Sequence, residues 1–347
     1  MAAYRSLKQT HLIFLCLLAR YRSGWKFVAG LLFGLFLWLG VWLFLIAGQL
    51  GRPHPDNVWV AGAYELKTRA AERLSGKRKV LLVGGSATMF GVNSSLVADG
   101  LDRPTVNFAV NAGLGAHALP AEVDKHIQSG DIVLMPLEYR LLLWDGRPSY
   151  VTISWVLEHP KTLQDWNLKS LAWGLWSLPL KRVLQGYQSF SPDELGKGLY
   201  GPHRLDQNGD QIQTRALQRT PQQWEGLVRL SPERYDELYA KTTLGLDLWH
   251  YWWRRWQLRG ACLVVVPPPF LDHPAYNTQS YETFLNAIPD RVKARGVDYL
   301  GHPRDVFFPV EAMFDTNYHL TDEGRSVYTN WLLGVLHDAN VPCLQLR

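Results

Sequence analysis

The sequence predicts an α/β protein in which a mainly parallel sheet, covered by helices on both faces, follows one transmembrane helix. Strand-like apolar runs alternate with helix-like segments over residues 78–140 and again after residue 260, a pattern typical of parallel sheets. Residues 27–48, "FVAGLLFGLFLWLGVWLFLIAG", form a stretch of 22 residues without a charge. At ~1.5 Å per residue, this stretch is long enough to cross a bilayer core of about 30 Å.

The basic character of the chain is confined to its first residues. The chain holds 36 basic and 31 acidic side chains, and residues 1–26 contain five of the basic ones and no acid. Without these five, 31 side chains of each sign remain, so the charge does not indicate a nucleic-acid partner. A basic flank stays in the cytoplasm, which sends everything after residue 48 across the membrane.

The apolar stretch is interpreted as an uncleaved anchor rather than a signal peptide. The apolar region of a signal peptide is normally about 7–15 residues long, and no clear small-x-small cleavage site follows here. The predicted organisation is a cytoplasmic basic tail (1–26), an anchor (27–48), a polar linker (49–77) and an extracytoplasmic domain (78–347) with an insertion at about 141–260. In an oxidising compartment Cys262 and Cys343 either pair or remain two small unpaired core residues.

Five apolar runs are predicted to form the strands of the sheet. They are Val80–Val83, Thr105–Val110, Asp131–Pro136, the run that ends at Pro267, and Val297–Leu300. The fourth ends at its proline because proline cannot continue a central strand. Helices are expected to start at Ser94 and to cover Leu119–Gln128, Tyr281–Ala294 and Thr321–Leu336.

The insertion at 141–260 is expected to be mostly helical and is rich in tryptophan. Trp249, Trp252, Trp253 and Trp256 recur at the spacing of one helix face, which favours packing against the sheet over sugar stacking or contact with a membrane partner. The segment Leu168–Leu184 is amphipathic with lysines near both ends. A buried insertion helix is favoured for it over a helix on the outer membrane surface.

A candidate nucleophile follows the first strand, in "VLLVGGSATMFG". Ser86 comes directly after Gly84 and Gly85, which allow a sharp turn and a close approach of substrate. Ligands bind at the ends of such strands in α/β sheets, and a serine there needs a base elsewhere in the chain. The alternative is a serine that only caps a helix or completes a turn.

His319 is the candidate base, in "FDTNYHLTDEGRSVYTNWLL". It lies just before a helix start marked by Thr321. Asp315, four residues upstream, can accept a hydrogen bond from the imidazole and stabilise its protonated form. Glu138 and Asp322 are the alternative acids for this role. A ring nitrogen of His319 is expected to approach hydrogen-bonding range of Ser86 Oγ, about 2.6–3.2 Å and often looser without substrate.

These segments resemble the SGNH (GDSL-like) hydrolase superfamily. The resemblance rests on "GGS" after the first strand, "NFAVNAG" after the second and "DTNYHLTDEGRSVYTNWL" before the last helix, and it covers about residues 78–140 and 260–338. It is nearest to the membrane-anchored branch that includes the alginate O-acetylation proteins and the D-alanine transfer protein of teichoic acid modification. The resemblance implies a three-layer, flavodoxin-like sheet.

The resemblance implies a role for each matching residue. Ser86 becomes the nucleophile, His319 the general base and Asp315 the orienting acid, with the backbone N–H groups of Ser86 and Gly113 in the oxyanion hole. The chain departs from the family pattern at two points. Thr316 stands where the family's acid usually lies, and "MPLEYR" replaces the third block, so the missing side-chain donor is replaced by Asn111, Tyr139 or Arg140 or is absent. The loss of one such donor can cost on the order of 100–1000-fold in rate.

The resemblance implies an O-acyltransferase, most simply O-acetyl, that modifies an extracytoplasmic polysaccharide from a single-pass position in a bacterial inner membrane. It also implies an integral-membrane acyltransferase as the partner that relays the acyl donor. An esterase or deacetylase with the same residues and a catalytically silent assembly or glycan-binding protein are the alternatives. The sequence has no phosphate-binding loop, complete dinucleotide motif or compact metal-ligand spacing, so no cofactor or metal is expected.

Overall fold

In the computed structural model, five strands form one parallel sheet in the order β2-β1-β3-β4-β6. The structure describes residues 2–191, 198–239, 241–339 and 341–344, with side chains from residue 24 onward except 164 and 165. The strands are β1 (Val80–Leu82), β2 (Thr105–Asn107), β3 (Ile132–Pro136), β4 (Cys262–Val266) and β6 (Asp298–Tyr299). They confirm the predicted parallel sheet. The strand order reverses between β1 and β3, the point at which sheets of this kind bind ligands.

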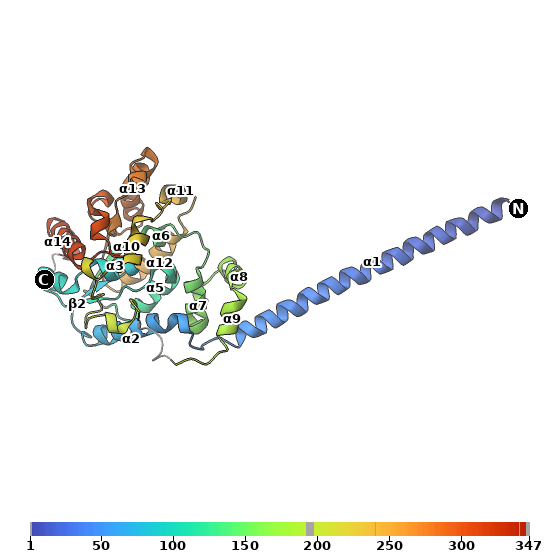
Figure 1. The fold of residues 1–347 in the computed structure, drawn as a ribbon, viewed down its shortest axis with the longest axis horizontal. Coiled ribbons are helices and arrows are strands. Elements are labelled where there is room, and N and C mark those ends of the chain that lie inside the picture. Colours follow the sequence, from blue (N-terminus) through green and yellow to red (C-terminus); the bar gives the residue numbers. More distant parts are fainter. Residues whose placement is uncertain (1, 192–197, 240, 340, 345–347) are drawn as a thin grey trace. The chain divides into compact units, whose positions relative to one another are not determined.

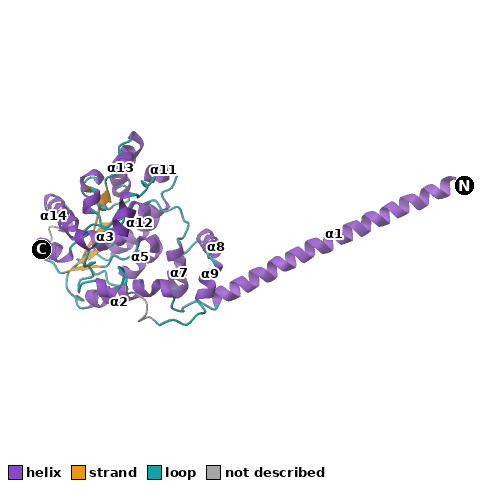
Figure 2. Ribbon diagram, viewed as in Figure 1, coloured by secondary structure: helices purple, strands orange, loops and turns teal. Residues whose placement is uncertain are grey.

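Helices surround the sheet (Figures 1 and 2). They are α2 (Val58–Glu72), α3 (Ser86–Gly91), α4 (Ser94–Leu101), α5 (Gly115–Asp124), α6 (Tyr139–Leu142), α7 (Tyr150–Glu158), α8 (Leu168–Ser177), α9 (Leu180–Gln185), α10 (Pro221–Val228), α11 (Tyr235–Tyr239), α12 (Leu244–Leu258), α13 (Gln279–Lys293) and α14 (Asp322–Asp338). A separate pair of short parallel strands, β5 (Phe270–Leu271) and β7 (Phe307–Phe308), lies outside the main sheet.

Each face of the sheet belongs to its own apolar cluster. Val133 and Leu134, neighbours in β3, lie in different clusters because successive side chains of a strand point to opposite faces. The first cluster includes the four tryptophans of α12, and Trp253 Nε1 donates to Met135 Sδ at 3.2 Å. The second includes Tyr328 and other residues of α14. The predicted packing of the tryptophan stripe against the sheet is therefore confirmed.

The N-terminal helix forms a compact unit of its own. The chain divides into residues 1–50 and residues 51–347, and the first unit is built on the helix α1 (Ala2–Ala47). Its part Gly24–Ala47, with a mean hydropathy of 2.4, is long and apolar enough to cross a membrane. This part contains nearly all of the predicted anchor.

Two predictions about the organisation of the chain are wrong. The segment 49–77 is not a linker, because its helix α2 buries Val60, Ala63 and Tyr64 in the core of the second unit. Its polar appearance is misleading, since even Lys67 is buried and donates to two backbone carbonyls. The segment Leu168–Leu184 is not one buried helix either. It forms α8 and α9, and Trp176 is 81% exposed.

A disulfide joins Cys262, the first residue of β4, to Cys343 after α14, with a Cα–Cα distance of 5.5 Å. The two cysteines are therefore paired and are not two separate unpaired core residues. Structural disulfides are rare in the reducing cytosol and frequent in exported proteins. The bond thus supports, independently of the charge pattern, an extracytoplasmic location for the second unit.

Removal of this disulfide should destabilise the second unit. The bond closes a loop with a sequence separation of 81 residues, for which chain entropy alone gives a loss of about 4–5 kcal/mol. We expect the Cys262→Ala/Cys343→Ala double variant to unfold at a lower denaturant concentration than the wild type in detergent micelles. A reductant should destabilise the wild type and leave the double variant unchanged. Equal stability of the two proteins would contradict a structural role for the bond.

Candidate active site

Ser86 is the first residue of helix α3 and follows a tight turn at the end of β1. This short helix was not predicted, whereas the helix predicted to start at Ser94 is confirmed as α4. A Cβ atom on Gly84 would overlap the Thr88 side chain, and one on Gly85 would overlap Ala112 and the Glu138 carboxylate. Only glycine fits at both positions. The Ser86 residue itself is half-buried, so the turn presents it at the carboxyl end of the central strand.

The buried carboxylate of Glu138 holds this turn. Its two oxygens accept hydrogen bonds from the backbone N–H groups of Gly85, at 2.9 Å, and Ala87, at 2.8 Å. Glu138 follows β3, which pairs with β1, so the two strand ends are joined through one side chain. Burial raises the pKa of Glu138, although its backbone hydrogen bonds and the nearby His319 act in the opposite direction. In the sequence, the position of Glu138 just after β3 could have indicated its contact with the Ser86 turn, but Glu138 was considered only as a partner of the imidazole.

Asp315 and His319 form the predicted pair. Asp315 Oδ1 lies 2.7 Å from His319 Nδ1, which leaves Nε2 as the ring nitrogen for a proton transfer. Asp322 instead accepts hydrogen bonds from Thr214 and Arg325, so it is not the acid that orients the ring. The Tyr200 hydroxyl donates to Asp315 Oδ2 at 3.4 Å and adds a contact from the insertion that the sequence did not indicate.

The imidazole lies against the helix that begins with Ser86. The His319 ring stacks on Phe90 of α3, with centroids 4.0 Å apart and planes 7° apart. Phe90 lies one helical turn after Ser86, on the same side of the helix. Among the described residues no hydrogen bond joins Ser86 directly to His319. Such bonds are often long in the absence of substrate and tighten in the complex.

Of the four predicted oxyanion-hole residues, Gly113 and Asn111 bind each other, whereas Tyr139 and Arg140 lie in different surroundings. Gly113 N–H donates to Asn111 Oδ1 at 2.7 Å, so in this conformation the expected donor is already engaged. Tyr139 is fully buried in an aromatic cluster with Tyr235, Phe270 and Phe284, where burial raises the pKa of its hydroxyl. Arg140 is exposed. Tyr139, one of the three candidates for the missing donor, is therefore held by its ring in an aromatic core.

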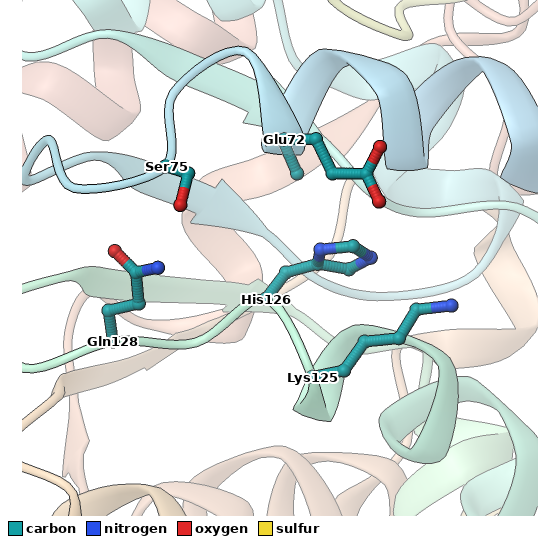
Figure 3. A pocket seen from close by; sticks show the side chains of 6 residues that line it. Glu72, Ser75, Lys125, His126 and Gln128 are labelled. Carbon is teal, nitrogen blue, oxygen red and sulfur yellow. The ribbon is translucent and has the colours of Figure 1, made fainter.

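A polar hollow of about 250 Å³ lies elsewhere, near the amino ends of β1 and β3 (Figure 3). Glu72, Ser75, Lys125, His126 and Gln128 line it together with Ala71. Its histidine lies 3.4 Å from the Thr68 hydroxyl, and burial lowers the pKa of this histidine to about 4. Because Ser86 lies at the carboxyl end of β1, this hollow is separate from the candidate site. No group of three or more potential metal-ligating residues occurs in the part of the chain that the structure describes.

No protein-family model matches the sequence, and no curated protein is significantly similar to it. The chemistry must therefore be argued from the site. A half-buried serine at a strand end and a partly buried aspartate–histidine pair that stacks on Phe90 of the same helix are side chains of the kind that nucleophilic sites use. The arrangement can support attack by a serine hydroxyl and proton transfer to a histidine.

Replacement of Glu138 should loosen the Ser86 turn. Glu138→Gln keeps the shape but can accept only one of the two backbone hydrogen bonds, because its NH₂ group is a donor. We expect a loss of about 1–3 kcal/mol in the free energy of unfolding, measured by denaturant unfolding in detergent micelles. Glu65→Gln, a change of an exposed acid on α2, is the matched control and should have little effect.

The same variant should change the pH dependence of stability. The raised pKa means that folded Glu138 keeps its proton to a higher pH than the unfolded chain does. The contribution of Glu138 to the free energy of unfolding is therefore fully present at low pH. It is lost as the pH rises from the ordinary glutamate pKa through the folded pKa. The free energy of unfolding of the wild type, relative to that of Glu138→Gln, should fall over this range. Parallel pH profiles would contradict a protonated Glu138.

Proposed function

We propose that this chain is a membrane-anchored serine O-acyltransferase of the SGNH type, most simply an O-acetyltransferase, that modifies an extracytoplasmic polysaccharide. One observation carries the proposal. The Asp315–His319 pair stacks on Phe90 of the helix that starts with Ser86, at the carboxyl end of a parallel sheet. The strand order and the helices around the sheet are compatible with the three-layer arrangement of that superfamily.

In the first half of the proposed reaction, Ser86 Oγ attacks the carbonyl carbon of an activated acyl donor. His319 Nε2 takes the serine proton, and Asp315 stabilises the imidazolium through Nδ1. The backbone N–H of Ser86 donates to the oxyanion of the tetrahedral intermediate. When the intermediate collapses, the bond to the donor breaks, the leaving group takes the proton from His319, and Ser86 carries the acyl group as an ester.

In the second half, a sugar hydroxyl takes the place of the leaving group. His319 Nε2 removes its proton as the oxygen attacks the Ser86 ester. The second tetrahedral intermediate then collapses, Ser86 regains its proton from the imidazolium, and the acyl group leaves on the sugar. The donor must be relayed from the cytoplasm because acyl-coenzyme A is absent outside it. An integral-membrane acyltransferase is the proposed partner, and a bacterial inner membrane is the proposed location.

Two other functions remain as alternatives. An esterase or deacetylase would use the same residues with water as the acceptor. A catalytically silent assembly or glycan-binding protein is favoured by two observations, the engaged Gly113 N–H and the lack of a direct hydrogen bond between Ser86 and His319 in the described structure. The disulfide and the apolar part of α1 support an exported, anchored location for all three functions.

The orientation of the chain can be tested by reporter fusions. The basic tail at 1–26 predicts a cytoplasmic N-terminus, so a periplasm-dependent reporter joined after residue 60, or at the C-terminus, should be active. A reporter that works only in the cytoplasm is the control at the same two positions and should be silent. Cytoplasmic activity from either fusion would overturn the proposed location and with it the need for a relayed donor.

The functions are separated by the ester content of the exported glycan. Ser86→Ala should leave folding intact and abolish acylation, and His319→Ala should do nearly the same because nucleophile and base act as a unit. Asp315→Asn should have a milder effect. Ser95→Ala, at an exposed serine on α4, is the control and should leave the ester content unchanged.

The direction of the change identifies the function. A lower ester content in Ser86→Ala cells indicates transfer, and a higher content indicates an esterase. Ester content equal to that of the wild type, with the variant folded and abundant, would contradict both enzymatic functions.

A further inference from the structure

Helices α8 and α9 expose large apolar side chains that no element among the described residues of the second unit covers. Leu168 is 83% exposed, Trp176 81%, Leu180 57% and Leu184 54%. We call these four side chains the apolar face of α8–α9. Large apolar side chains left in contact with water on neighbouring helices mark an interaction surface.

The remaining sides of α8 and α9 pack against the rest of the second unit. Leu178, between the helices, and Arg182 of α9 are buried. Arg182 Nε donates to Ser154 Oγ of α7 at 2.8 Å, and Asn167 caps the start of α8 through Ser170 N–H. The orientation of the apolar face is therefore set by packing and is not that of a loose segment.

The apolar face begins close to the point where the chain enters the second unit. Gly51 N–H donates to Leu157 O at 2.8 Å, and the Arg52 guanidinium lies 5.8 Å from the ring centre of Tyr187. Tyr187 comes three residues after Leu184. Only residues 48–50 separate Gly51 from the end of α1 at Ala47, a reach of about 14 Å at full extension. The chain that follows α9 thus contacts the first residues of the second unit.

The charged side chains of α8 and α9 themselves have one sign. Residues 166–191 contain Lys169, Lys181 and Arg182 and no acidic residue. Both lysines are exposed. A helix with exposed leucine and tryptophan on one side and lysine beside them is typical of segments that lie in the interface of a membrane with anionic lipids.

We propose that the apolar face of α8–α9 inserts into the headgroup region of an anionic lipid bilayer. The inference rests on the proposed anchoring by α1 and adds a second membrane contact. Trp176 and the three leucines enter the boundary between headgroups and acyl chains, and Lys169 and Lys181 pair with lipid phosphates. One tether alone leaves the second unit free to rotate above the membrane. Two contacts hold it in a single orientation.

The inference can be tested by spin labelling of the full chain in nanodiscs of anionic lipid. Leu180→Cys carries the label in a Cys16→Ser background, with the Cys262–Cys343 disulfide intact. The matched control is Val327→Cys on α14, where Val327 is 61% exposed against 57% for Leu180. Helix α14 lies across the second unit from α8 and α9 (Figure 1). Collision rates with oxygen, which enters lipid, and with a water-soluble nickel complex are compared at both sites.

At position 180 we expect oxygen collisions to exceed nickel collisions severalfold, and the reverse at position 327. Equal nickel accessibility at the two sites overturns the inference. Protection of position 180 in native membranes but not in nanodiscs of the purified protein also overturns it and assigns the face to a protein partner. The anchoring is checked separately, because a chain that does not stay with the nanodiscs in gel filtration disproves the anchor itself.

Discussion

The hydrogen bonds from Gly85 and Ala87 to the buried Glu138 carboxylate are the constraint on which the candidate site depends. They join the end of β3 to the turn after β1, and the parallel pairing of these strands brings the two ends together. Because α3 begins directly after this turn, fixing the turn also fixes the direction of α3. Phe90 on α3 then supports the His319 ring, which also contacts Asp315 and Tyr200. The Phe90–His319 contact thus depends on the direction of α3, and the direction of α3 depends on the Glu138 hydrogen bonds.

The position of Glu138 also matters for the proposed chemistry. An ionised carboxylate beside Ser86 would oppose the negative charge that develops on the carbonyl oxygen in the tetrahedral intermediate. Burial raises the pKa of Glu138, which acts against this repulsion. The engaged Gly113 N–H leaves the oxyanion with few donors in this conformation. A site of this kind suits slow transfer to a bound acceptor better than rapid hydrolysis.

The sequence predicted what depends on local patterns. Apolar runs located the strands, and the four-residue spacing of Asp315 and His319 was sufficient to predict their hydrogen bond. Features that depend on distant partners were missed. Lys67 made α2 look polar, although carbonyls at Asn107 and Gly209 satisfy its ammonium group inside the core. Likewise, no local pattern shows that Tyr139 lies in an aromatic cluster or that Asn111 binds the Gly113 N–H.

The disulfide closes a loop that contains one part of the candidate site and leaves the other part outside the loop. The loop that it closes between Cys262 and Cys343 contains both Asp315 and His319, whereas Ser86 and Glu138 lie outside it. In a reducing cytosol the segment that carries the base lacks its covalent closure, and an oxidising compartment restores it. The pair that supplies the proposed base is thus enclosed by a covalent loop, whereas the Ser86 turn depends on strand pairing and on the Glu138 hydrogen bonds alone.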